Sequence, residues 1–137
     1  MRKMAKNTVE KTDRVLEILV RESTLTLKQL EAIMFYYDNI DRKIVRNGYV
    51  EFKGNKVPKG AFFRTLNQAK NNIRKAIVTL LIMAYLGLID INQLNIIMQL
   101  NNIMMQFKNR EGGVSEETLN AFLERLKNMI DLRKRVK

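Results

Sequence analysis

Residues 57–88 read VPKGAFFRTLNQAKNNIRKAIVTLLIMAYLGL, and this stretch decides the fold. The pattern predicts one long helix from Lys59 to Leu86, with Gly87 as its C-terminal stop. The first half of this helix is polar and basic along one side. The second half is apolar nearly all round, which is typical of a helix at the centre of a core or in a subunit interface. The expected inward stripe consists of Leu66, Ala69, Ile73, Ile77 and Leu80.

Positive charge is concentrated just before this helix and in its first half. Residues 42–75 hold ten basic side chains against one acid, Glu51, and so carry +9 of the chain's net charge of +11. Residues 76–107 contain one charged side chain, Asp90. Solvated surfaces normally mix the two signs, so the imbalance favours a surface that binds a polyanion, with an ordinary basic surface as the simpler alternative. Nucleic acid is the leading partner for such a chain.

Composition narrows the other functional classes. The chain has 137 residues, 46% hydrophobic and 28% charged, which predicts one globular domain over 1–137. It lacks cysteine and histidine, which excludes disulfides, thiolate metal sites and a histidine-based catalytic triad. No acidic pair has a nucleophile, a phosphate-binding glycine loop or metal-ligand spacing beside it. We therefore expect no enzyme activity, no cofactor, no metal and no small-molecule substrate.

The sequence also bears on where the protein resides. The N-terminus is basic, but no apolar stretch follows it, so it lacks the pattern of a secretory signal. The apolar run 76–89 is shorter than the roughly 18–20 residues that a membrane span needs, and Asp90 ends it. These features predict a cytoplasmic, nucleoid-associated protein without a membrane partner.

Two shorter helices are expected before the basic stretch. The first runs from about Val9 to Glu22. The second begins after Thr26, because Thr26-x-x-Gln29 has the spacing of a capping box, in which each side chain bonds to the other residue's backbone N–H. Its expected inward face consists of Leu27, Leu30, Ile33, Met34 and Tyr37.

Two more helices are expected after the long one. Asp90-x-x-Gln93 has capping-box spacing and opens a helix rich in methionine and amides. Ser115 begins the last helix, which ends in the basic run 133–135. The Met-rich helix is either adaptable core packing or a self-association surface, so 91–135 is a candidate oligomerisation segment.

The sequence pattern of residues 43–58 differs from the helical pattern on either side and predicts a small antiparallel β-hairpin or meander. Asn47-Gly48 is the turn chemistry of a two-residue hairpin, and Gly54-Asn55 supplies a second turn signal. Tyr49 and Phe52 are three positions apart, so an unbroken strand places their rings on opposite faces, one toward the core and one toward a ligand. With the helices, this predicts a mainly α fold of the α+β class, with about five helices.

Aromatic rings and amides are interleaved with the basic residues. Flat rings stack on unpaired bases, and amides donate to phosphates or to the edges of exposed bases. The simpler alternatives are core packing for the rings and an inert polar face for the amides. The candidate nucleic-acid-binding residues are the bases Arg42, Arg46, Lys53, Lys56, Lys59, Arg64, Lys70 and Arg74, the rings Tyr49, Phe52, Phe62 and Phe63, and the amides Asn67 and Asn71.

Residues 45–90 resemble the ThermoDBP-related single-stranded DNA-binding proteins of hyperthermophilic archaea. The basic, amide and apolar positions of 57–88 carry the similarity. The resemblance implies binding of single strands with little sequence preference, in a cleft with an apolar floor and basic rims, and assembly into dimers or larger oligomers. The zipper-like C-terminal helix of the family founders is interrupted here at Arg133, so the Met-rich helix is a candidate substitute. The implied floor is Tyr49, Phe52, Phe62 or Phe63, and the implied rims are Lys53, Lys56, Lys59, Arg64, Lys70 and Arg74.

Two other functional classes fit parts of the sequence. A winged helix–turn–helix protein for duplex DNA has two N-terminal helices and a basic hairpin, as expected here. Its recognition helix would be 27–40, which contains one lysine and two acids, Glu31 and Asp38. A helix that enters a major groove normally carries more positive charge than this. A structural protein whose basic face docks an acidic partner is the third class. A binding assay separates the three classes. Preference for single strands indicates the first, preference for duplex indicates the winged helix–turn–helix protein, and binding of neither indicates the structural protein.

Overall fold

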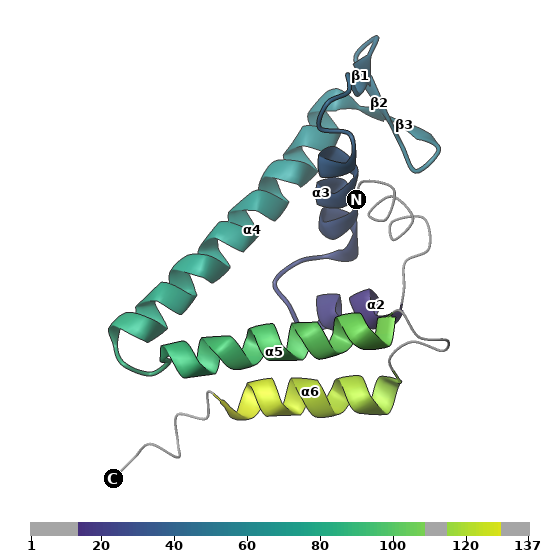
Figure 1. The fold of residues 1–137 in the computed structure, drawn as a ribbon. Helices are drawn as coiled ribbons and strands as arrows, with labels where there is room; N and C mark the ends of the chain where they lie inside the picture. The colour runs from purple at the N-terminus through teal and green to yellow at the C-terminus, as the bar shows by residue number, and fades with distance from the viewer. Residues whose placement is uncertain (1–13, 109–114, 130–137) are drawn as a thin grey trace. The chain divides into compact units, whose positions relative to one another are not determined.

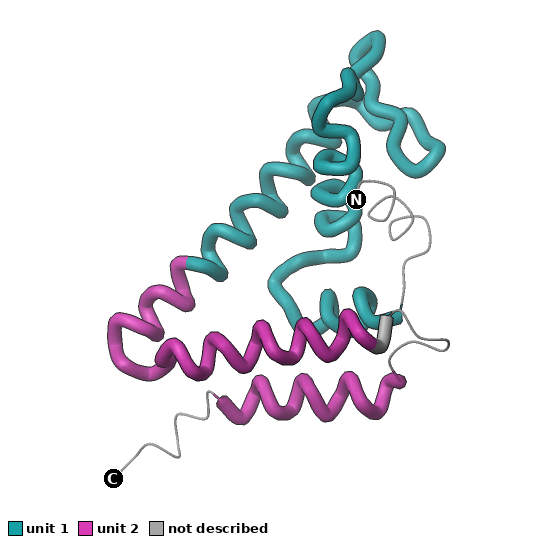
Figure 2. Tube along the Cα trace, in the orientation of Figure 1, with its two compact units in different colours: residues 1–77 teal, residues 78–137 magenta. Residues whose placement is uncertain are grey.

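The computed structural model describes residues 14–108 and 115–129. It is mainly helical with a small antiparallel sheet, which confirms the predicted α+β class. The chain divides into two compact units, Met1–Ile77 and Val78–Lys137 (Figure 2). The elements in chain order are α2 (Arg14–Arg21), α3 (Leu27–Asp38), β1 (Val45–Arg46), β2 (Tyr49–Phe52), β3 (Asn55–Pro58), α4 (Lys59–Tyr85), α5 (Ile91–Lys108) and α6 (Glu116–Asn128) (Figure 1).

The capping box that was expected to open the second helix is present at the start of α3. The Thr26 hydroxyl accepts from the Gln29 N–H at 3.1 Å, and the Gln29 Oε1 accepts from the Thr26 N–H at 3.1 Å. These two bonds satisfy donors that a helix start otherwise leaves without partners. Helix α2 precedes α3, and the expected start of the first helix at Val9 lies outside the described residues.

The inward face of α3 differs from the expected one. Its buried residues are Glu31, Ala32 and Asp38, whereas Tyr37 is 56% exposed. The prediction that Tyr37 faces inward is therefore wrong. Apolar residues occur on more than one side of this helix, so periodicity alone does not fix which side meets the sheet.

The three strands form a meander in the order β1-β2-β3, joined by two tight turns. Asn47 (φ 53°) and Gly48 (φ 82°) form the first turn, and Lys53 (φ 54°) and Gly54 (φ 78°) form the second. A two-residue turn with positive φ at both positions matches the twist of the strands it joins. The predicted first turn is confirmed. The second lies one residue earlier than expected, because Asn55 already pairs with Phe52.

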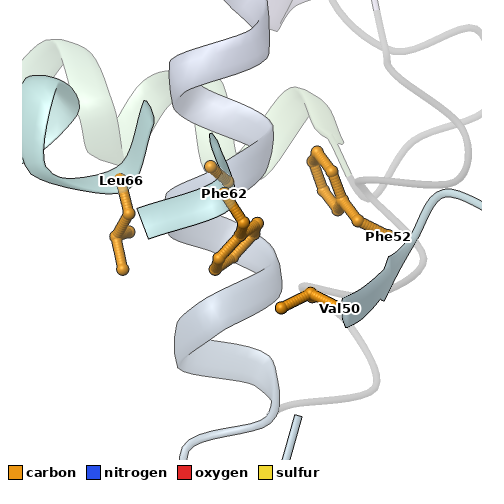
Figure 3. Close-up of a cluster of buried hydrophobic side chains, with 5 residues drawn as sticks. Val50, Phe52, Phe62 and Leu66 are labelled. Carbon is orange, nitrogen blue, oxygen red and sulfur yellow. The ribbon is translucent and has the colours of Figure 1, made fainter. Parts of the chain in front are cut away.

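The core of the first unit is a cluster of apolar side chains from α3, β2 and α4 (Figure 3). Phe52 and Phe62 lie in this cluster with ring centroids 5.5 Å apart, and Phe35 packs edge-on against both. Edge-to-face pairs of this kind contribute beyond the burial of their area. The five buried members are Ala32, Val50, Phe52, Phe62 and Leu66.

Helix α4 ends as the sequence predicts. The Gly87 N–H donates to the Ala84 carbonyl at 3.0 Å and the Leu88 N–H to the Met83 carbonyl at 2.9 Å, with Gly87 at φ +78°. This is the Schellman arrangement, in which glycine adopts the left-handed backbone that closes a helix. The expected inward stripe of α4 is only partly confirmed. Leu66 and Ala69 are buried, but Ile73, Ile77 and Leu80 are 37%, 61% and 39% exposed.

In the second unit, α5 and α6 lie side by side and antiparallel (Figure 1), and the Gln93 side-chain amide donates to the Met129 carbonyl at 3.3 Å. The predicted Asp90–Gln93 capping box is present, with bonds of 2.9 and 3.0 Å. Ser115 caps α6 as expected. The basic run 133–135 lies outside the described residues. None of the helices in the described part of the chain is long and apolar enough to cross a membrane.

Candidate nucleic-acid interface

The outward face of the sheet carries a tyrosine flanked by basic side chains. Burial alternates along β2, so Tyr49 is exposed at 47% while Val50 and Phe52 point into the core. Arg46 lies directly opposite Tyr49 on β1, and Lys56 lies opposite Glu51 on β3. Directly opposed residues of antiparallel strands share a face. The register therefore places one open ring, two cations and one acid together.

These side chains border an open depression of about 750 Å³, here called the sheet-face depression. The end of α3 and the loop that follows it complete the border with Asn39, Arg42 and Lys43. Among the described residues, the side chains of Arg42, Lys43, Arg46 and Lys56 form no ion pair or hydrogen bond, and neither does that of Glu51. The four cations are therefore available to an anionic ligand.

Four of the fourteen residues predicted as a site border this depression: Arg42, Arg46, Tyr49 and Lys56. The prediction omitted Lys43, although it belongs to the same basic stretch. It also omitted Asn39, because the depression is completed by the end of α3, outside that stretch. Proximity in sequence to Arg42 was the signal for Lys43, whereas nothing local in the sequence marks Asn39.

Two of the predicted stacking rings are core residues. Phe52 is 6% exposed and Phe62 is 2% exposed, so neither offers a ring face to a base (Figure 3). Phe52 is inward because it is three positions from Tyr49 on a strand, and Phe62 is inward because the first turns of α4 pack on the sheet. Phe63 is half-buried against Phe62, with ring centroids 5.2 Å apart. Of the four rings expected to supply a floor, Tyr49 is therefore the one that is exposed.

Two of the predicted rim cations contact residues of helix α3. The Lys53 ammonium donates to the buried Glu31 carboxylate at 2.7 Å, which ties the β2–β3 turn to α3. The Lys70 ammonium lies 5.0 Å from the centre of the Tyr36 ring, within the range of a cation–π contact. Both cations are therefore held by α3 rather than free, and their contact with phosphates stays a prediction.

The remaining predicted residues on α4 form a separate surface. Arg64, Asn67, Asn71 and Arg74 are exposed along the side of the helix opposite Phe62, and none of them borders the sheet-face depression. We call these four residues the α4 stripe. The Arg74 guanidinium donates to the Asn71 Oδ1 at 2.6 Å. Lys59 is also exposed, but it does not border the depression either.

The prediction that all these bases converge on one groove is therefore wrong. Their positions were inferred from their closeness in sequence, but the strand register and the helical repeat distribute them over different sides of the first unit. The described residues also bring together no group of three or more acidic side chains that would suit a metal ion. The sheet-face depression is the best candidate site for a ligand, and its four unpaired cations suit an anionic one.

No family model matches the chain, and searches of curated proteins and of solved structures found no match either.

Proposed function

We propose that this protein binds single-stranded nucleic acid, with little preference for sequence, through the sheet-face depression. The observation that carries the proposal is the exposed ring of Tyr49, with Arg46 directly across the strand pair and three more unpaired cations around the same depression. A ring face binds a base by stacking, and the cations bind the phosphates on either side of it. The biological role that follows is protection of exposed single strands, including those of the nucleoid.

The two kinds of contact contribute differently. Stacking of one base on Tyr49 contributes about 1–3 kcal/mol and is nearly independent of salt. Phosphate contacts release counterions, so four cations give a logarithmic salt slope near −3, at about −0.7 per contact with a single strand. The proposal therefore expects binding that weakens steeply with salt but retains a part that salt does not remove.

A single strand fits the depression better than a duplex does. A base inside a duplex has no free face, whereas Tyr49 is an exposed ring at the start of the central strand of the sheet. The helix that a winged helix–turn–helix protein would insert into the major groove is α3, whose one basic residue is Lys28. The resemblance of 45–90 to the ThermoDBP-related proteins supports the same class of ligand.

The test compares three variants by fluorescence anisotropy with a labelled oligo-dT. Tyr49→Leu is expected to weaken binding about 5- to 100-fold at every salt concentration, because the lost contact is stacking. Arg46→Ala is expected to weaken binding at low salt and to reduce the salt slope by about 0.7. The matched control is Arg74→Ala, which removes an exposed arginine of the α4 stripe and is expected to leave the affinity within about twofold.

Two outcomes would contradict the proposal. Equal losses from Arg46→Ala and Arg74→Ala would show that the protein attracts oligonucleotides by net charge alone. An effect of Tyr49→Leu that disappears at high salt would show that the ring does not stack.

A further inference from the structure

Glu51 is an acid on the basic face of the sheet, and the contacts proposed so far do not use it. It is the only acid among residues 42–75, and it borders the sheet-face depression. Burial alternates along β2, so Glu51 lies on the same exposed face as Tyr49. An acid at a site for a polyanion repels phosphates. Its position is therefore explained either by a partner within the fold or by another part of the ligand.

No partner within the fold holds the Glu51 carboxylate. The Lys59 N–H donates to the Gly48 carbonyl at 3.0 Å, and the alternation of the ladder then makes Glu51 and Lys56 a pair without backbone hydrogen bonds, the kind whose side chains lie closest. Even so, within residues 14–108 and 115–129 no ion pair or hydrogen bond joins the Glu51 side chain to Lys56 or to any other residue. Both carboxylate oxygens are therefore open to a ligand.

The spacing along β2 places the Glu51 carboxylate within reach of a base that stacks on Tyr49. The two residues are two positions apart on one face of a strand, a separation of about 7 Å. A base stacked on the Tyr49 ring leaves its edges free for hydrogen bonds with neighbouring side chains. The glutamate side chain and the width of the base together span the separation. Glu51 can therefore contact the edge of the stacked base.

The four bases differ in what they offer to a carboxylate. Its two oxygens accept hydrogen bonds, and they bond best to two donors that lie side by side. Guanine presents two such donors on its Watson–Crick edge, N1–H and N2–H. Thymine presents one N–H between two carbonyl oxygens, and adenine and cytosine each present one amino group beside a ring nitrogen that only accepts. Guanine is therefore the base that matches the carboxylate.

We propose that Glu51 recognises guanine at the nucleotide stacked on Tyr49, by accepting hydrogen bonds from its N1–H and N2–H groups. This inference rests on the proposed function and adds one base-specific contact to a site whose other contacts, to a base face and to phosphates, carry little sequence information. The unpaired cations around the depression offset the repulsion between the carboxylate and the phosphates. The preference concerns one nucleotide, so a strand of mixed sequence satisfies it by placing any of its guanines on Tyr49.

The test is fluorescence anisotropy with labelled oligo-dT strands of about eight nucleotides that carry a single different base at the centre. A central guanine is expected to tighten binding about 3- to 20-fold over oligo-dT, toward the lower end for a bidentate contact because the depression is open. A central adenine is expected to stay within about twofold of oligo-dT, which separates recognition of the edge from stacking of a purine. Hypoxanthine, which lacks the N2 amino group, is expected to bind between guanine and adenine.

Glu51→Gln is expected to bring the guanine and thymine strands to within about twofold of each other, because its amide places a donor where the second acceptor was. Binding of oligo-dT by this variant shows that it is folded. The matched control is Glu117→Gln, which removes an equal charge from the exposed start of α6 and is expected to keep the preference for guanine.

Three results would overturn the inference. A wild type that binds oligo-dT but prefers guanine no more than adenine excludes recognition of the edge and leaves the proposed function intact. A preference for guanine that persists in Glu51→Gln excludes Glu51 as its source. A protein that binds none of the strands overturns the proposed function and this inference together.

Discussion

Replacement of Phe62 by leucine tests the division between core and ligand-binding rings. Phe62 is 2% exposed and has three aromatic neighbours, with ring centroids 5.7 Å from Phe35, 5.5 Å from Phe52 and 5.2 Å from Phe63. Leucine keeps the site apolar but removes the three edge-to-face contacts and leaves part of the ring's volume unfilled. The substitution changes packing without exposing or burying a charge.

The expected loss of stability follows from these contacts. Truncation of a buried phenylalanine to alanine costs about 3–5 kcal/mol, and each edge-to-face pair contributes about 0.5–1.5 kcal/mol beyond its area. Leucine recovers most of the burial but none of the ring contacts. We therefore expect Phe62→Leu to lower the free energy of unfolding by about 2–3 kcal/mol.

The assay is urea unfolding followed by far-UV circular dichroism, with oligo-dT affinity measured separately in the absence of denaturant. Tyr49→Leu is the matched substitution, because it makes a comparable change to a ring that is 47% exposed. Tyr49→Leu is expected to change stability by less than about 0.5 kcal/mol while weakening binding. Phe62→Leu is expected to lower stability while leaving the affinity for oligo-dT unchanged. A Phe62→Leu protein of wild-type stability but reduced affinity would refute the assignment of this ring to the core.

Three more substitutions test other parts of the account. Glu31→Gln leaves Lys53 without its carboxylate partner and is expected to lower the free energy of unfolding by about 1–2 kcal/mol in urea titrations, whereas unchanged stability would show that the pair is dispensable. Gly54→Ala is expected to cost about 1 kcal/mol in the same assay because of the left-handed backbone alone, since a Cβ there meets no atom within 4 Å. Glu51→Gln removes the one acid that borders the depression and is expected to raise oligo-dT affinity about two- to fivefold at low salt, with little effect at high salt, and a loss of affinity would contradict its repulsive role.

Local chemistry made much of the fold predictable from the sequence. The capping boxes at Thr26 and Asp90 depend on residues three positions apart, and both are present. Gly87 ends α4 because a left-handed residue is needed there, and Asn47-Gly48 makes the first turn for the same reason. These features depend only on residues close to one another in the sequence, so one sequence is enough to predict them.

The composition of the site was less predictable because it depends on which face of each element meets the core. Strand periodicity separated Tyr49 from Phe52 but did not say which ring is inward. Lys53 counted as a rim cation until its contact with Glu31, 22 positions away, assigned it to the fold. The α4 stripe is close to the hairpin in sequence, but it lies on the helix face opposite the core. Long-range contacts of this kind leave no local pattern.

The most direct test of the account is the relative affinity of the protein for oligo-dT and for a duplex of the same length, measured by anisotropy at two salt concentrations. Binding through an open Tyr49 ring and unpaired cations predicts tighter binding of the single strand at both concentrations, with a preference that grows as salt rises because stacking is retained. Equal or tighter binding of the duplex at the higher salt concentration would contradict it.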